Sequence, residues 1–482
     1  MQNINQRMAK GILWMVGARL LDRSVGIVST LILARLLVPG DFGLIAMATA
    51  IGGMLDLLGS FSFDVALIQK TNTERRHYDT VWTFNVIFGM VCTAGLILLA
   101  GPAASYYNEP RLSVVMYVLS VSYFLGAFAN IGVVDFRKEL NFKQEFIFIF
   151  ARRIVTFIAT ITAAFLLRSY WALLIGMTLG KVVGLAMSYA MNVFRPRFTL
   201  SATKELFHFS KWMFLNNCLA FLMHDGCTFI IGRVFGASSL GIYTVSYEIS
   251  NLPSTELVAP INRVTFPGFA KMVDTDAIAS SYLRLLGMIT LLILPVGTGI
   301  AAVAEPLVLA ALGEKWITAF PLIAILGING AIAATQTNNV SVWLAVGKPY
   351  LVTIVTSFFL LALFPGIYFC LDAFGVVGAG YAYLMAQAVN VPLGMSITKR
   401  LLKFKWRDVA RVVWRPILAT GVMFVAVHLL DRGINNANPW LRLVIDAGVG
   451  TLTYVFVILT LWLISARPNG AETFCLERAK LI

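Results

Sequence analysis

The stretch from Trp14 to Gly43 constrains the fold of this chain more than any other. It is apolar over a length sufficient to cross the ~30 Å hydrocarbon core of a bilayer as a helix, yet it carries Arg19, Asp22 and Arg23. At ~1.5 Å per residue, a helix that starts near Gly11 places Arg19 roughly 12 Å along, close to mid-bilayer. Spacings of three and four residues put the three charges on one face. Such charges are costly unless they face a wet interior, so we expect this helix to present them to a cavity.

The rest of the chain has the composition of a multi-pass membrane protein. Of its 482 residues, 59% are hydrophobic and 13% are charged, and the mean hydropathy is +0.80. Soluble domains carry about 25% charged residues. The apolar runs, bounded by charged residues or by Gly, Pro and Asn, predict 14 transmembrane helices. None of these runs is strand-like, so we predict an all-α membrane protein.

The net charge of +14 has a topological explanation. In a soluble protein it would suggest nucleic acid, but here Lys and Arg are about fourfold more frequent in one set of alternate loops than in the other. Cytoplasmic loops accumulate these residues, so both termini are predicted to be cytoplasmic, in agreement with an even number of spans. We expect no nucleic-acid partner.

Part of the opening stretch recurs later in the chain. At one constant offset, Trp14 aligns with Trp212, Arg35 with Arg233, and Gly43 with Gly241. Six predicted helices lie between the copies, so the second copy enters the membrane the same way up, as a parallel repeat. We therefore predict an N-terminal six-helix lobe over residues 1–200, a C-terminal six-helix lobe over 201–402, and helices 13 and 14 with a cytoplasmic tail over 403–482.

The sequence favours a transporter over an enzyme. It contains no P-loop, no HExxH motif and no CxxC motif, so we expect neither a nucleotide, a cofactor nor a metal site. The predicted loops are too short to form a catalytic domain. We expect no catalytic residues.

Three cations at bilayer depth are the predicted anion-binding residues: Arg19, Arg23 and Lys181. Two cations to one anion on the first helix leave a positive remainder suited to an anionic ligand. A local pair between Asp22 and an arginine, which would only pin helices together, is the competing interpretation. For Lys181 the competing interpretation is a side chain that reaches back to the cytoplasmic face.

Four carboxylates within predicted helices have two possible roles: Asp22, Asp56, Asp225 and Glu248. They could carry a coupling proton or sodium ion, or they could simply neutralise the arginines. The sequence leaves both roles open. The helix that carries Glu248 also contains Pro253, which is expected to bend or break it.

Several segments resemble a known family: ARLLVPGDFGLIAMA, DVALIQK, RVFGASSLGIYTVSYEISNLP and PGFAKM. They are similar to the polysaccharide-transporter branch of the multidrug/oligosaccharidyl-lipid/polysaccharide exporter superfamily, and most similar to Wzx-type lipopolysaccharide and colanic-acid exporters. The resemblance covers most of residues 1–400. It is fairly specific, because a related Arg-to-Gly element opens both halves of the chain.

The resemblance implies a V-shaped bundle of two six-helix lobes with two further helices. It implies export of undecaprenyl-pyrophosphate-linked oligosaccharide, an exopolysaccharide or lipopolysaccharide repeat unit, across the bacterial inner membrane by alternating access. Cationic cavity residues would hold the pyrophosphate; Arg19 and Arg23 match by position, and Lys181 is added from its depth. The implied partners are the lipid-linked oligosaccharide and membrane lipids, with a polymerase and export machinery as further candidates.

Two alternatives within the same superfamily stay open: a lipid II flippase, which differs only in the glycan, and a cation-coupled drug exporter, whose cargo the deep cations would repel. A sugar transporter of the major facilitator type is disfavoured, because QKTNTERRHYD stands where GxxxDRxGR is expected. A polymerase or ligase for lipid-linked sugars is disfavoured because it needs a long outer loop.

Overall fold

The computed structural model describes most of the chain. The described residues are 17, 21–59, 63, 67, 73–139, 141–258, 261, 265, 268–272, 274–433, 437–465 and 473, without the side chains of 58 and 204–216. Arg19 lies outside this set. The described residues form helices and connecting loops with no strand, which confirms the all-helical prediction.

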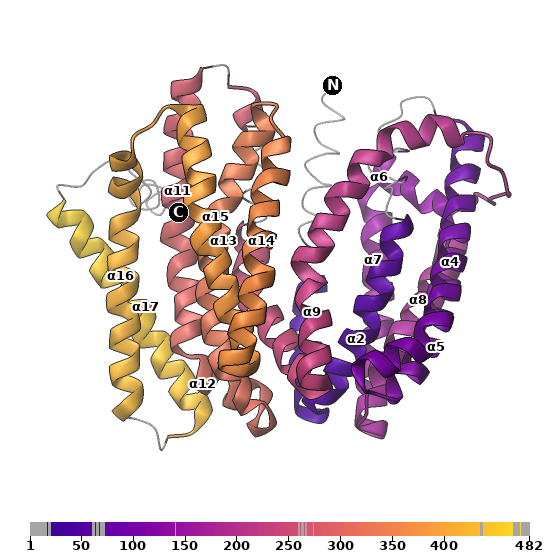
Figure 1. Cartoon of the computed structure of the whole chain (residues 1–482), viewed down its shortest axis with the longest axis horizontal. Coiled ribbons are helices and arrows are strands. Elements are labelled where there is room, and N and C mark those ends of the chain that lie inside the picture. Colours follow the sequence, from indigo (N-terminus) through magenta and orange to yellow (C-terminus); the bar gives the residue numbers. More distant parts are fainter. Residues whose placement is uncertain are drawn as a thin grey trace. The chain divides into compact units, whose positions relative to one another are not determined.

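The α-helices have the following bounds: a helix over 21–36, α2 Pro39–Asp56, α4 Arg75–Tyr107, α5 Arg111–Ala127, α6 Asp135–Lys138, α7 Phe142–Leu167, α8 Trp171–Met191, α9 Thr203–Pro253, α11 Thr275–Ala302, α12 Ala304–Leu307, α13 Phe320–Ala345, α14 Tyr350–Phe374, α15 Gly378–Leu402, α16 Trp406–Gly433 and α17 Pro439–Ile464 (Figure 1). Within the described residues, nine helical segments are long and apolar enough to cross a membrane. The number rises to ten if the bent pair Arg111–Ala127 and Ile131–Lys138 forms one span. The chain is a multi-pass membrane protein.

Contacts divide the chain into two compact units, Met1–Gly241 (unit 1) and Ile242–Ile482 (unit 2). In unit 1, α4 packs on α5, α7 on α8, and α5 on α8. The α7–α8 contact is close because α8 presents glycines: a Cβ atom on Gly176 would lie 1.7 Å from Oγ1 of Thr160. Small residues at such positions let membrane helices approach closely, where dispersion contacts replace the missing hydrophobic drive.

The repeat-related glycines of the sequence meet in unit 1. A Cβ atom on Gly43 would lie 1.7 Å from the carbonyl oxygen of Ala237, and one on Gly241 would lie 1.8 Å from that of Pro39. The backbone of α2 therefore touches the backbone of α9 at a place where no side chain fits. At Gly236, φ is +75°, so α9 is two helices that meet at a break rather than one continuous rod.

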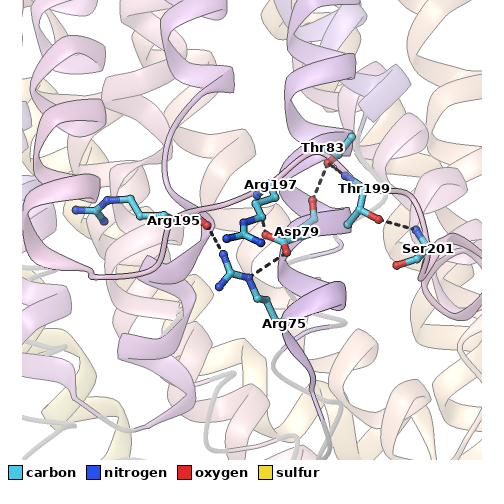
Figure 2. Close-up of polar contacts among 7 residues, drawn as sticks. All are labelled: Arg75, Asp79, Thr83, Arg195, Arg197, Thr199 and Ser201. Atoms are coloured by element: carbon cyan, nitrogen blue, oxygen red, sulfur yellow. Dashed lines mark hydrogen bonds and ion pairs between the residues drawn. The ribbon is translucent and has the colours of Figure 1, made fainter.

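The segment between α8 and α9 is held along α4 by backbone N–H groups (Figure 2). The N–H of Arg197 donates to Asp79 at 2.8 Å, and the N–H of Thr199 donates to Thr83 at 3.0 Å. Arg75 bridges the same region, since it pairs with Asp79 at 3.4 Å and donates to the carbonyl of Arg195 at 2.8 Å. This extended segment is thus an ordered part of unit 1.

Unit 2 is built on α11, α13 and α15, with α14 packed on α15 and α16 on both α11 and α17. A buried apolar cluster surrounds Tyr282 and Trp343, both fully enclosed. Between α11 and α13, Gly297 and Gly327 permit another close backbone approach.

Candidate functional site

Two of the predicted charged residues, on different helices of unit 1, act on each other electrostatically. Asp56, the last residue of α2, interacts electrostatically with Lys181 of α8. The hydroxyl of Tyr123 on α5 donates a hydrogen bond to Asp56, and Cys92 of α4 lies 3.8 Å from it. Four helices therefore place polar atoms at one point. Asp56 and Lys181 are exposed side chains, so they line an open surface rather than a packed core.

A second ion pair joins the first helix to α7. Asp22 lies 3.2 Å from Arg153, and both side chains are partly exposed. The neighbouring Arg152 acts electrostatically on Lys181. Arg23 lies half-buried on the helix over 21–36. We call Asp22, Arg23, Asp56, Arg152, Arg153 and Lys181 the unit 1 charge cluster.

Glycines make room for the cations of this cluster. A Cβ atom on Gly26 would lie 2.6 Å from a terminal nitrogen of Arg153, and one on Gly184 would lie 3.2 Å from Cδ of Arg152. In the same way, a Cβ atom on Gly126 of α5 would lie 3.5 Å from both Cδ and Nζ of Lys181. Long cationic side chains can thus lie along neighbouring helices instead of being forced outward.

Counting Lys and Arg loop by loop predicts Arg152 and Arg153 in a cytoplasmic loop, and this prediction is wrong. They lie inside α7, which begins at Phe142, roughly 15 Å along the helix at ~1.5 Å per residue. Their position about ten residues into an apolar run could have indicated that they lie inside a helix. With them, the unit 1 charge cluster has four cations and two carboxylates and therefore a net positive charge.

The remaining predicted residues lie elsewhere or outside the described part. Asp225 is half-buried on α9 and faces the charge of its neighbour His224. Glu248 is exposed and belongs to unit 2. Arg19 is not among the described residues, so its predicted role stays a prediction. The sequence analysis did not identify Tyr123 or Cys92, because a lone hydroxyl or thiol in an apolar run carries no distinctive pattern.

The long apolar helices and the open, positively charged polar surface define the class: a multi-pass membrane transporter. More specifically, the chain belongs to the family described as polysaccharide biosynthesis protein, whose model matches residues 32–321. This membership confirms the resemblance found in the sequence.

Among curated proteins, the chain is 23% identical over 444 residues to the lipopolysaccharide biosynthesis protein WzxC of Escherichia coli (strain K12), covering 89% of each chain. It is also 23% identical over 448 residues to the succinoglycan biosynthesis transport protein ExoT of Rhizobium meliloti (strain 1021), covering 89% of this chain and 88% of that one. Among solved structures, the inward closed conformation of the lipid II flippase MurJ matches 95% of this chain and 100% of its own, with a TM-score of 0.74 and 14% identity. That likeness shows a shared fold.

Proposed function

We propose that this protein is a flippase that moves undecaprenyl-pyrophosphate-linked oligosaccharide, an exopolysaccharide or lipopolysaccharide repeat unit, across the bacterial inner membrane by alternating access. The observation that carries the proposal is the net positive unit 1 charge cluster, set among apolar helices in a chain whose relatives include a lipopolysaccharide biosynthesis protein and a succinoglycan transport protein. The likeness to the MurJ fold is compatible with this role.

The chemistry of the cargo fits such a site. The sugar pyrophosphate cannot cross hydrocarbon, whereas the polyprenyl tail can remain in it. A polar, cationic surface that is open sideways to lipid accommodates both parts. Two negative charges that move toward a positive exterior gain about 2.3 kcal/mol per charge per 100 mV. The membrane potential therefore supplies part of the driving force without any chemical step on the cargo.

In this proposal Lys181, Arg23 and Arg19 hold the pyrophosphate, and Arg152 and Arg153 join them. Guanidinium groups suit this task because their planar N–H groups match phosphate oxygens in pairs. Asp22 and Asp56 balance the cations when no phosphate is present. Asp225 and Glu248 remain candidates for charge balance or ion coupling.

The proposed architecture has 14 transmembrane helices, with both termini cytoplasmic and the two lobes over 1–200 and 201–402 forming a V-shaped bundle, followed by 403–482. Two breaks support this count: Gly236 divides α9, and Gly375, with φ of +60°, separates α14 from α15. The reciprocal contacts of Gly43 with Ala237 and of Gly241 with Pro39 obey the same offset as the sequence repeat. Such reciprocity is expected of a parallel repeat related by a pseudo-two-fold axis.

The proposal extends to partners. The lipid-linked oligosaccharide and membrane lipids are the direct ones, and a polymerase and export machinery would act on the cargo after it has crossed. Lipid II differs from this cargo in its glycan, so a lipid II flippase is the second candidate, favoured by the MurJ fold likeness alone. A cation-coupled drug exporter is less consistent with a net positive cluster.

The test is reconstitution of the full chain in proteoliposomes with a lipid-linked oligosaccharide and, in parallel, lipid II. We expect the oligosaccharide to appear in the opposite leaflet, and a strain that lacks the gene to accumulate it. Equal or faster movement of lipid II would favour the second candidate. If neither lipid moves while the protein is inserted and folded, the proposed function is wrong.

A further inference from the structure

Helix α17 of unit 2 carries an arginine that faces more carboxyl groups than it can neutralise. Arg442 donates to Asp431 of α16 at 2.8 and 3.1 Å, and it lies 3.8 Å from Glu305 of α12. One turn along α17, Asp446 interacts both with Arg442 and with the carboxyl group of Asp431. Three carboxyl groups therefore share one guanidinium group.

Asp446 is the most enclosed of these carboxyl groups. Its exposed fraction is 0%, and none of the described residues donates a hydrogen bond to either of its oxygens. By contrast, the side chain of Asp431 is 17% exposed and that of Glu305 is 43% exposed. A buried carboxylate without a donor or a dedicated cation is strongly unfavourable, whereas a carboxylic acid is tolerated and can itself donate.

A cavity of about 360 Å³ adjoins Asp446. It lies between α11, α16 and α17, and its α11 wall is formed by residues without charge: Pro295, Val296, Gly299, Ile300 and Val303. Pro295 has no N–H, so the carbonyl of Leu291 loses its helical partner, and the hydroxyl of Tyr454 on α17 donates to it at 2.7 Å. This bond ties α17 to α11 at the cavity.

We propose that Asp446 is a proton-binding site, held as a neutral acid that donates its hydrogen bond to Asp431. A proton suits the site better than a metal ion, because the guanidinium group of Arg442 already stands among the three carboxyl groups and would repel a metal cation. When the O–H bond of Asp446 breaks, the proton leaves by way of the cavity. The carboxylate that remains is then neutralised by Arg442, which turns from Asp431 and Glu305 toward it.

The charged surroundings permit this exchange. On its own helix Asp446 faces Arg442, from α16 it faces Asp431, and through Arg442 it is linked to Glu305 of α12. On either side of Asp431 along α16, the exposed side chains of His428 and Arg432 lie 3.2 Å from each other. Loss of the proton therefore changes the partner of one arginine that connects three helices, α12, α16 and α17.

The direct test is infrared spectroscopy of the full-length protein in liposomes at neutral pH. We expect a carbonyl band of a protonated carboxyl group in the wild type, its loss in Asp446→Asn, and a shifted band in Asp446→Glu. Thr451→Val is the matched control, because Thr451 lines the same cavity and does not titrate. Identical carboxyl bands in the wild type and in Asp446→Asn would overturn the proposal, since Asp446 would then be ionised. This readout does not depend on transport.

A coupling role rests on the proposed function and has its own test. With the membrane potential held at zero, a gradient of about one pH unit is worth ~1.4 kcal/mol per proton, so we expect it to shift the cargo distribution between leaflets about tenfold in the wild type. Asp446→Asn should still flip the cargo but show no such shift. An unchanged shift in Asp446→Asn would exclude coupling through this residue. If the wild type flips nothing, the proposed function fails, while the infrared result still decides whether the proton site exists.

Discussion

A polar centre of unit 1 and a polar centre of unit 2 differ in charge and in exposure to solvent. In unit 1 the polar centre is ionic and open: Asp56 and Lys181 are exposed side chains that come from different helices. In unit 2 the centre between α11, α13 and α15 is neutral and closed, unlike the ionic group around Arg442 on α17. The hydroxyls of Tyr282 and Thr398 both donate to the side-chain oxygen of Asn339, at 2.6 and 3.0 Å, and all three residues are fully or almost fully buried.

The difference follows from the cost of removing each group from water. An amide–hydroxyl network that is satisfied internally can be sealed among apolar side chains at little cost, and it then fixes how the helices pack. Ionised groups need water or a charged ligand. The unit 1 charge cluster therefore has the features of a binding surface, and the neutral network between α11, α13 and α15 has those of a scaffold.

Lys181→Ala should produce the largest effect and would test the comparison most directly. Loss of one charge-assisted contact to phosphate is worth about 1.5–3 kcal/mol, so the initial flipping rate in proteoliposomes should fall about 10- to 100-fold. Lys181→Arg, which keeps the charge, should retain most of the activity. An unchanged rate in Lys181→Ala would show that the unit 1 charge cluster is not the phosphate site.

Asn339→Leu should act on stability instead. It removes the shared acceptor of the buried hydroxyls of Tyr282 and Thr398, of which Thr398 keeps the carbonyl of Gly394, so we expect a loss of about 1–3 kcal/mol of unfolding free energy. Thermal unfolding in detergent measures this loss, and Tyr282→Phe, which removes one donor only, should cost less. The flipping rate per folded molecule should be unchanged; a specific loss of transport with normal stability would give unit 2 a role in binding.

Much of the fold could be predicted because its signals are long. Apolar runs of transmembrane length report membrane helices whatever their neighbours are. The alignment of Gly43 with Gly241 indicated a repeat, but the close backbone contacts at both glycines are seen only in the structure. The site was harder to predict. Lys181 and Asp56 were each identified by depth, but nothing in the sequence states that α8 and α2 bring them together.

Arg152 and Arg153 show why a count of Lys and Arg per predicted loop can assign helix residues to a loop. Positive residues near cytoplasmic ends and positive residues inside a helix look alike in composition, and only the helix start at Phe142 separates them. The neutral network of unit 2 was not predicted at all, because Asn, Thr and Tyr are common in membrane helices. Their pairing depends on which helix faces meet.

Asp22→Asn should have a smaller effect and would sharpen the role of the ionic centre. The Asp22–Arg153 pair is partly exposed, with side-chain exposures of 47% and 36%, so its removal should change the unfolding free energy by less than ~1 kcal/mol. Arg153 would then be available to an anion, and we expect pyrophosphate-lipid to bind about two- to fivefold more tightly. Arg153→Gln is the reciprocal control and should weaken binding. Weaker binding in Asp22→Asn would mean that the pair only orients the helices.

The smallest effect is expected for an ion pair that solvent screens, between α4 and the start of α5. Glu109 accepts hydrogen bonds from Nε and Nη2 of Arg111 at 2.8 and 2.9 Å, which hold the pKa of Glu109 below its ordinary range. A carboxyl group whose pKa is lower in the folded state stabilises the folded protein fully at a pH above its unfolded-state pKa of ~4.3. That stabilisation is lost as the pH falls through its folded-state pKa.

Because half of Arg111 is exposed, solvent screening should keep this contribution below ~1 kcal/mol. Melting temperatures measured in detergent should therefore decline slightly less on acidification in Glu109→Gln than in the wild type. Ser113→Ala removes a neutral hydrogen bond from the first turn of α5 to the carbonyl of Pro110 and should leave the acid slope intact. An acid slope in Glu109→Gln equal to that of the wild type would show that the pair contributes nothing.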